Sequence, residues 1–300
     1  MAKHSVKDWF AVTRYWSFPV STMPVLASFA YSFSKGLLPG GAMPWVIFGL
    51  CLLGVVLLHS AGNVLSDYYD FKTGVDNENA FAVPNLVFHK FEPKEYILFS
   101  IILFVLGCGT GVAIALLCGP VLWIIGGAGV LLTALYSFLK YHALGDADIF
   151  IIFGILPVLG TVYAVTGELH WEALVLSLPI GIITVSVLHA NNAFDSETDK
   201  AAGIKTFAML IGGKASSVLY AVYMIVPFVA VVAAVIAGLL HPLALLCLIA
   251  CIPAFKNFKQ ACTYDKQGIN AMKGLDLASA KLQIAFSVPL SLGLFLSVLL

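Results

Sequence analysis

The sequence predicts an all-α protein, a polytopic transmembrane bundle of about nine helices. Hydrophobic residues make up 60% of the chain and charged residues only 11%, whereas about 25% of the residues in a typical soluble domain are charged. The mean hydropathy is +0.97, and long apolar stretches recur along the whole chain. Because about 20 apolar residues are enough for a helix to cross a bilayer, we expect lipid to surround this protein.

The expected helices are apolar stretches separated by polar or turn segments. The basic N-terminal segment superficially resembles a signal peptide, but the apolar run after it is too long and has no small-residue cleavage site. We therefore take this run as the first membrane span. The expected spans cover residues 18–38, 43–66, 96–117, 120–139, 149–165, 173–190, 218–240, 242–255 and 280–300.

The basic residues predict how the bundle is oriented. Of the sixteen Lys and Arg residues, all but Lys35 fall on one side of this arrangement. Cytoplasmic loops of membrane proteins accumulate Lys and Arg. We therefore expect a protein integral to the cell membrane (inner or plasma membrane), with a cytoplasmic N-terminus and an external C-terminus.

Charge and cysteine content exclude several other classes of protein. The formal net charge is zero and no block of like charge stands out, so nucleic acid is not an expected partner. The six cysteines form no C-x-x-C pair and lie mostly inside apolar stretches. Neither a disulfide framework nor a zinc site is therefore expected.

Two polar segments rich in Asp follow the second and the sixth expected helix. Each segment opens with Asn, continues with paired Asp and carries Lys and Gly close behind. Four helices separate the two segments, which suggests a duplicated four-helix unit. We expect one domain over residues 1–300, with pseudo-repeats at roughly 15–140 and 145–256 and a final helix.

Helical geometry brings the polar side chains of each segment to one face. Since each helical residue advances by about 100°, an amide and two carboxylates of each segment fall within roughly a 60° sector. Both faces are expected on the cytoplasmic side of the bundle. The two sets are Asn63, Asp67 and Asp70, and Asn192, Asp195 and Asp199.

Four converging carboxylates predict a divalent cation. Like charges held close together repel each other unless cations neutralise them. Mg²⁺ typically takes one or two carboxylates and completes its shell with water and substrate phosphate, so two such sets suit a diphosphate. The alternatives are a solvated helix end, or ion pairs with nearby lysines that would suit phosphate oxygens equally well. These lysines are Lys72, Lys200 and Lys205.

The pattern N-x-x-x-D-Y-x-D-x-x-x-G-x-D, from Asn63 to Asp76, and the D-x-x-x-D of Asp195 and Asp199 resemble the UbiA superfamily of membrane prenyltransferases. The likeness includes TRYWSFPVSTMPV, KYHALGDADIFIIFGILPVLG and ETDKAAGIKT, and extends from residue 14 to about residue 213. Within the superfamily the sequence is most similar to the 1,4-dihydroxy-2-naphthoate prenyltransferases of menaquinone biosynthesis. It departs from the usual pattern at Ser66, where Asn normally precedes the first Asp, at Gly74, where a third acid is displaced to Asp76, and at Arg14-Tyr15, where Arg-Pro is usual.

The resemblance implies a UbiA-type bundle and a Mg²⁺-dependent prenyltransferase. The expected partners are a polyprenyl diphosphate, as prenyl donor, and an aromatic quinone precursor, as acceptor, with 1,4-dihydroxy-2-naphthoate as first choice. Mg²⁺ binding and catalysis fall to Asp67, Asp70, Asp195 and Asp199. The substrate-binding candidates are Asn63, Asn192, Arg14, Lys140, Tyr141, Lys205, Tyr68 and Lys72.

Several interpretations stay open at this point. Other acceptors of the superfamily are 4-hydroxybenzoate, homogentisate, a glycerol-phosphate lipid and haem. A transporter of divalent cations or organic anions also fits an internal repeat with membrane carboxylates, although transporter sites usually lie at the midplane. Arg14 and Lys140 also fit the role of membrane-edge anchors. His59 and His189 are candidates to touch the acceptor or act as bases, or are held by neighbouring helices.

Overall fold

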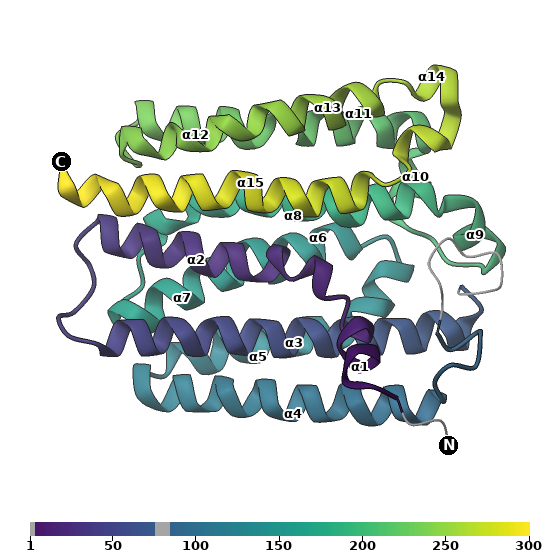
Figure 1. Cartoon of the computed structure of the whole chain (residues 1–300), viewed down its shortest axis with the longest axis horizontal. Helices are drawn as coiled ribbons and strands as arrows, with labels where there is room; N and C mark the ends of the chain where they lie inside the picture. Colours follow the sequence, from purple (N-terminus) through teal and green to yellow (C-terminus); the bar gives the residue numbers. More distant parts are fainter. Residues whose placement is uncertain (1–3, 76–84) are drawn as a thin grey trace.

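The computed structural model describes residues 4–75 and 85–300. Long helices run side by side, and the two ends of the chain lie at opposite ends of the bundle (Figure 1). These two ranges contain helices and no β-strand, apart from an isolated bridge between His142 and Lys205. The prediction of an all-α bundle is therefore confirmed.

Nine segments cross the bundle within the described ranges, and each is a single helix or a run of two or three consecutive helices. Eight of them are long and apolar enough to span a membrane, and α2, with 16 residues, is the shorter ninth. They are α2 (Pro19–Ser34), α3 (Met43–Thr73), α4 (Pro93–Cys118), α5 (Val121–Tyr141), α6 (Gly145–Phe150) with η2 (Ile151–Ile155) and α7 (Leu156–Thr166), η3 (Trp171–Leu176) with α8 (Ser177–Phe194), α11 (Gly213–Tyr223) with α12 (Val226–Ile236), η4 (Pro242–Ala250) with α13 (Cys251–Ala261), and α15 (Leu275–Leu296) with η6 (Ser297–Leu299).

The sequence placed these helices correctly but made several of them too short. The predicted spans 242–255 and 280–300 correspond to the longer helices Pro242–Ala261 and Leu275–Leu299, and the span 218–240 is shifted to Gly213–Ile236. The added turns carry polar and charged residues, which hydropathy alone assigns to loops. A helix that leaves the hydrocarbon can continue into water, because its backbone groups remain paired within the helix.

Helix α3 shows this extension most clearly. Its 31 residues correspond to a length of about 46 Å at 1.5 Å per residue, compared with a hydrocarbon core of about 30 Å. The helix ends where Gly74 adopts a left-handed conformation with φ of 77°, which costs glycine little because it lacks a Cβ. The last turns of α3 therefore carry the first Asp set beyond the apolar part of the helix.

Short helices gather at the end of the bundle where α3 finishes. Figure 1 shows α9 and α14 at this end, with α10 close by. The short elements are α1 (Val6–Val12), η1 (Tyr15–Ser17), α9 (Ser196–Ala201), α10 (Phe207–Ile211), α14 (Tyr264–Gln267) and η5 (Gly268–Met272).

Helix α1 begins with a capping box between Ser5 and Asp8. The Lys90 ammonium beside Asp8, together with Ser5, holds the pKa of the Asp8 carboxyl well below its usual range.

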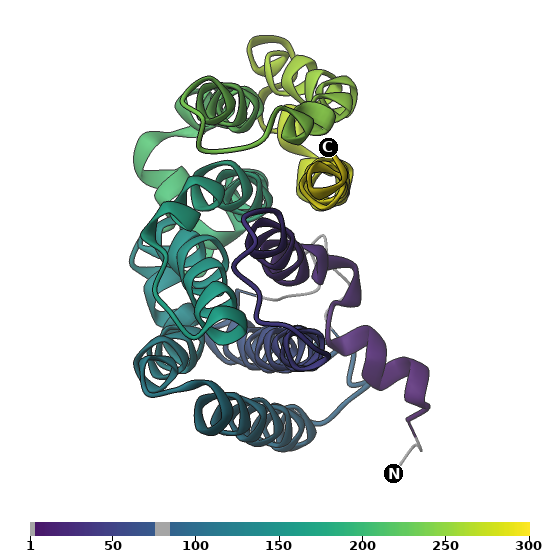
Figure 2. The ribbon, with the colours of Figure 1, turned by 90° about the vertical axis from the view of Figure 1, so that its left-hand side faces the viewer.

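Helix α2 occupies the interior of the bundle. Seen end-on, it lies between α15 and α3 (Figure 2), and it packs against α15, α7 and α3. Val25 and Phe29 of α2 are completely buried. This position explains why a helix of only 16 residues is stable, since packing supplies what length does not.

Two close contacts between backbones set the spacing of neighbouring helices. A Cβ atom placed on Gly293 of α15 would lie 2.0 Å from the carbonyl oxygen of Leu243 in η4. Gly181 of α8 meets Gly154, where a Cβ on Gly181 would lie 3.2 Å from the other Cα. Gly154 belongs to a π-helical turn, Ile151–Ile155, inside the span from α6 to α7. Such turns are frequent at functional sites.

Candidate active site

A cavity of about 580 Å³ opens among α3, α5, α8 and α9, and all four predicted aspartates line it. Asp67 and Asp70 come from the last turns of α3, Asp195 lies between α8 and α9, and Asp199 belongs to α9. Asp70 is 5% exposed and Asp199 is 2% exposed. Two acidic groups 125 or more residues apart in the chain thus share one cavity.

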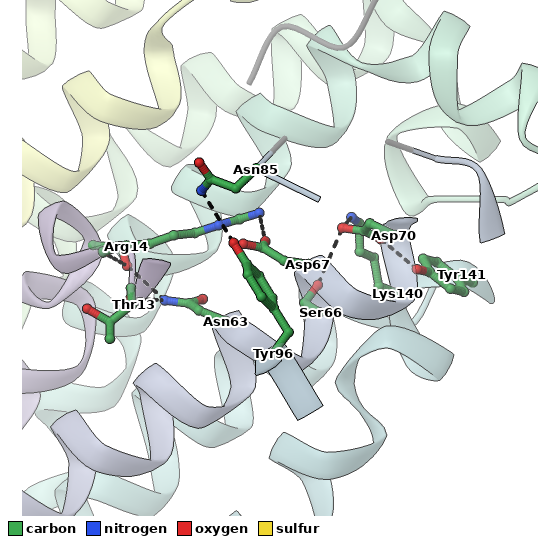
Figure 3. Close-up of polar contacts among 11 residues, drawn as sticks. Thr13, Arg14, Asn63, Ser66, Asp67, Asp70, Asn85, Tyr96, Lys140 and Tyr141 are labelled. Atoms are coloured by element: carbon green, nitrogen blue, oxygen red, sulfur yellow. Dashed lines mark hydrogen bonds and ion pairs between the residues drawn. The ribbon is translucent and has the colours of Figure 1, made fainter. Parts of the chain in front are cut away.

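Cationic and hydroxyl groups contact the first pair of aspartates (Figure 3). The Arg14 Nη2 donates to Asp67 Oδ1. Tyr141 Oη donates to Asp70 Oδ1 at 2.5 Å, and Lys140 Nζ lies 3.4 Å from Asp70 Oδ2. Lys140 is 7% exposed, so its ammonium is held inside the site rather than at the membrane surface.

The segment between α1 and η1 brings Arg14 to the cavity. Arg14 has a φ of 53°, a left-handed conformation that a non-glycine residue adopts at a cost. Asn63 Nδ2 donates to the carbonyl oxygen of Thr13 at 3.0 Å (Figure 3). It also donates to Ser17 Oγ at 3.3 Å. Asn63 therefore fixes this segment against α3, and strained backbone held in this way is typical of functional sites.

The second Asp set differs from its prediction in two ways. Asn192, Asp195 and Asp199 do not lie on one continuous helix, because α8 ends at Phe194 and α9 begins at Ser196. Asp and Ser favour helix ends over helix interiors, which accounts for the break. Asn191 rather than Asn192 lines the cavity. Asn192 is 1% exposed, and its Oδ1 has no hydrogen-bond partner among the described residues.

Besides Asn192, four predicted substrate-binding side chains are not among those that line the cavity: Tyr141, which contacts Asp70, and Tyr68, Lys72 and Lys205. Tyr68 packs against the cluster that includes Tyr96 and Leu103 of α4. Lys72 is exposed, and so is Lys205, whose backbone N–H donates to the carbonyl oxygen of Tyr141 at 3.1 Å. Helical phase alone separates Tyr68 and Lys72 from Asp67 and Asp70, since adjacent residues point about 100° apart. Asp76, the displaced third acid, lies outside the described residues.

The structure also adds residues that the sequence interpretation missed. Asn191 precedes Asp195 by four residues, the same spacing as Asn63 to Asp67, so comparing the two motifs at equal spacing would have found it. Tyr136 precedes Lys140 by one helical turn, so the two side chains share a face of α5, and this spacing could have predicted that Tyr136 lines the cavity. Lys273 and Asp276 belong to neither of the two Asp-rich motifs, so no sequence pattern pointed to them. The added lining residues are Ser17, Ser66, Tyr136, Asn191, Lys273 and Asp276.

The donor set suits Mg²⁺ shared with a substrate. Within residues 4–75 and 85–300, no three carboxylate, His or Cys groups lie close enough together to hold one ion by themselves. Mg²⁺ commonly binds through one or two carboxylates and takes its other ligands from water and substrate phosphates. The two separate carboxylate pairs around this cavity fit that pattern better than a closed cage of protein ligands.

The deeper wall of the cavity is largely apolar and aromatic. Its lining residues from α2, the π-helical turn and α8 include Val20, Ile152, Phe153 and Val187. His59 of α3 lines the same part, one turn before Asn63. His189 does not line the cavity: its Nδ1 lies 2.7 Å from Asp146 Oδ2, and it is completely buried. The cavity thus joins a charged mouth to an apolar interior.

The long apolar helices define an integral membrane protein, and its cavity joins charged side chains at one end to an apolar interior. The UbiA prenyltransferase family model matches residues 12–274. The chain belongs to the UbiA prenyltransferase family. The family part of the sequence interpretation is therefore confirmed, and the naphthoate subfamily stays a prediction.

Individual relatives agree with this assignment. UbiA prenyltransferase domain-containing protein 1 of Xenopus tropicalis is 32% identical over 240 residues, 75% of this chain and 66% of that protein. Its homolog in Drosophila melanogaster is 35% identical over 230 residues, 74% of this chain and 63% of that protein. The match therefore spans slightly less than two thirds of the length of these relatives.

Solved structures share the fold. The apo structure of a UbiA homolog from Aeropyrum pernix K1 has a TM-score of 0.71 at 15% identity and covers 95% of this chain and 98% of its own. A UbiA homolog from Archaeoglobus fulgidus bound to GPP and Mg²⁺ has a TM-score of 0.62 at 14% identity and covers 94% and 99%. The expectation of a UbiA-type bundle is confirmed.

Proposed function

We propose that this protein is a Mg²⁺-dependent prenyltransferase that transfers a prenyl group from a polyprenyl diphosphate to an aromatic quinone precursor. The observation that carries the proposal is the cavity itself. Its mouth combines Asp67, Asp70, Asp195 and Asp199 with cationic side chains, and its interior is apolar. A prenyl diphosphate has the same division between a charged head and an apolar chain.

Two cationic side chains at the mouth support the binding of a diphosphate. Arg14 and Lys140 pair with Asp67 and Asp70, and both basic groups can also donate charge-assisted hydrogen bonds to phosphate oxygens. Mg²⁺, held by the two aspartate pairs, would neutralise charge on the diphosphate and on the leaving group. Arg14 and Lys140 then stabilise the same developing charge from fixed positions.

The apolar interior protects the reacting carbon. When the C–O bond to diphosphate breaks, the allylic carbon becomes electron-poor, and water in the site would capture it as an alcohol. Ile152 and Phe153 exclude water from this part of the cavity. The ring of Tyr136, one turn from Lys140, lines the same space and can shelter the carbon by a cation–π contact.

The donor class is supported by the Archaeoglobus fulgidus homolog, which binds GPP and Mg²⁺. For the acceptor, 1,4-dihydroxy-2-naphthoate is our first choice, in menaquinone biosynthesis, on the basis of the sequence resemblance. The other candidate acceptors are 4-hydroxybenzoate, homogentisate, a glycerol-phosphate lipid and haem. The transporter alternative has less support, since the aspartates lie at the end of the bundle where α3 finishes.

The proposal is tested with purified protein in detergent, a radiolabelled prenyl diphosphate, Mg²⁺ and a panel of these acceptors. We expect organic-soluble product that disappears with a chelator and returns with Mg²⁺. Asp67→Asn and Asp195→Asn should each lower the rate by about 10²-fold or more, because each removes a ligand that acts in the transition state. Glu197→Gln is the matched control, since this exposed acid lies in the same segment but not in the cavity.

Failure to transfer to any acceptor, alongside flux of Mg²⁺ in liposomes, would reject the enzyme in favour of a transporter. Equal loss of activity in the Glu197→Gln protein would show that activity depends on the negative charge of this segment and not on Asp67 and Asp195 as ligands.

A further inference from the structure

His59 lies deep in the cavity, away from the aspartates. It precedes Asp67 by eight residues on α3, which is about 12 Å along the helix axis. The side chain is 7% exposed and still lines the cavity. Both ring nitrogens face serines: Nε2 lies 3.2 Å from Ser17 Oγ, and Nδ1 lies 3.0 Å from Ser21 Oγ. Of these two serines, Ser17 lines the cavity.

The hydrogen bonds around His59 accommodate either protonation state of the ring. The Ser17 hydroxyl lies 2.8 Å from the carbonyl oxygen of Arg14, and the Ser21 hydroxyl lies 3.1 Å from that of Phe18. An imidazolium can therefore donate from both nitrogens to serines whose own protons go to the backbone. In a neutral ring, the Ser17 proton turns from Arg14 to Nε2, while Nδ1–H still donates to Ser21.

The surroundings of the ring suit a planar aromatic ligand. Phe153, which lines the cavity, lies beside His59 with ring centroids 4.9 Å apart; Phe18 lies at 6.0 Å on the other side, outside the cavity lining. The charged side chains that face this space line the mouth of the same cavity: Arg14, Asp67, Asp70, Lys140, Asp195, Asp199, Lys273 and Asp276. His59 therefore lies between the charged mouth and Phe153, and the Ser17 hydroxyl, which also accepts from Asn63, lines the cavity beside it.

We propose that Ser17 and His59 form a proton relay that activates the hydroxyl group of the aromatic acceptor. This inference rests on the proposed prenyl transfer. It places the hydroxylated ring of the acceptor beside Ser17 and His59 in the interior of the cavity. The acceptor hydroxyl donates its proton to Ser17 Oγ, and the Ser17 proton passes to His59 Nε2. Ser17 touches the substrate, and His59 acts through it.

The atoms and electrons of the step balance. The activated ring carbon forms a bond to the allylic carbon as the C–O bond to diphosphate breaks, and the electron pair of that bond leaves with diphosphate. The product is first a ketone with a tetrahedral ring carbon. That carbon loses its proton to the released diphosphate, and the imidazolium returns the first proton to the ring oxygen through Ser17. Neutral His59 is thereby restored.

The relay is tested with Ser17→Ala, His59→Gln and the double variant that combines them, and Ser32→Ala is the control. With a phenolic acceptor, the first two should each lower transfer by about 10² to 10⁴-fold, the usual contribution of general base catalysis. The double variant should be no slower than His59→Gln alone, since both changes break one pathway. Ser32→Ala is suitable as the control because Ser32 is a completely buried serine of α2 whose hydroxyl donates to the backbone carbonyl oxygen of Ser28.

The acidity of the acceptor separates a proton relay from a structural role. Acceptors with more acidic hydroxyl groups need less help, so the defect of His59→Gln should shrink across a series of such acceptors. A defect of the same size for every acceptor, or no defect at all, overturns the relay alone. Absence of transfer by the unmodified protein overturns the proposed function and the relay together.

Discussion

Lys140 and Lys72 carry the same charge near the same end of the bundle, but their environments differ. Lys140 is 7% exposed and lies 3.4 Å from Asp70 Oδ2, whereas Lys72 is exposed. We predict that Lys140→Gln lowers prenyl transfer by about 10²-fold or more, because a fixed positive charge at the leaving group is lost. Lys72→Gln should change the rate little. Initial rates at saturating donor would measure both, and equal effects would contradict the assignment of Lys140 to the cavity.

From the sequence it was easier to predict which types of residue form this site than which side chains point into the cavity. The spacing of Asn63, Asp67 and Asp70 correctly placed three polar groups on one side of α3, since helical phase is fixed by residue number. The same reasoning failed for Asn192 because it assumed a helix that continues through Asp195. Ser17 and Asp276 could not be predicted, since neither belongs to a repeated motif and only tertiary packing brings them to the cavity.

At the scale of secondary structure elements, a buried hydrogen bond between His189 and Asp146 joins α6 to α8. His189 Nδ1 lies 2.7 Å from Asp146 Oδ2, with side-chain exposures of 0% and 11%. We predict that Asp146→Ala destabilises the protein by about 1 to 3 kcal/mol, because the buried Nδ1 of His189 loses its hydrogen-bond partner. The control is Asp265→Ala, which removes an exposed pair with Lys214 and should have little effect. Thermal unfolding in detergent would compare the two variants.

The contact between Gly293 and Leu243 predicts a second effect at this scale. Gly293→Ala would place a Cβ 2.0 Å from a backbone carbonyl oxygen of η4, so one of the two elements must shift. Such overpacking typically costs about 1 to 3 kcal/mol. Gly127→Ala in α5 meets no atom within 4 Å and should be neutral or slightly stabilising, since Ala favours helices. Similar melting temperatures for both variants would show that α15 is not held at this distance.

Helix boundaries show what hydropathy can and cannot predict. Each span was identified because a bilayer demands a long apolar stretch. Their polar ends were missed, since hydropathy detects contact with lipid rather than helical structure. The two-repeat organisation over residues 15–140 and 145–256 stays a prediction that the helix order alone does not test.

At the scale of the whole molecule, the two ends of the chain lie at opposite ends of the bundle (Figure 1). Since all Lys and Arg except Lys35 fall on the side of the N-terminus, we predict a cytoplasmic N-terminus and an external C-terminus. Reporter domains fused to either end, one active only in the cytoplasm and one active only outside it, would test this orientation. Activity of the same reporter at both ends would contradict it.

The overrun of α3 beyond the hydrocarbon, by about 16 Å if the helix stands upright, has a consequence for how products separate. Under the proposed function, chemistry at this boundary yields one strongly hydrated anion and one oily molecule. The anion departs into water and the apolar product partitions into the acyl chains. Diphosphate therefore does not have to cross the hydrocarbon core, and the prenylated product does not have to enter water. Solubility itself would then help to draw the two products apart and oppose the reverse reaction.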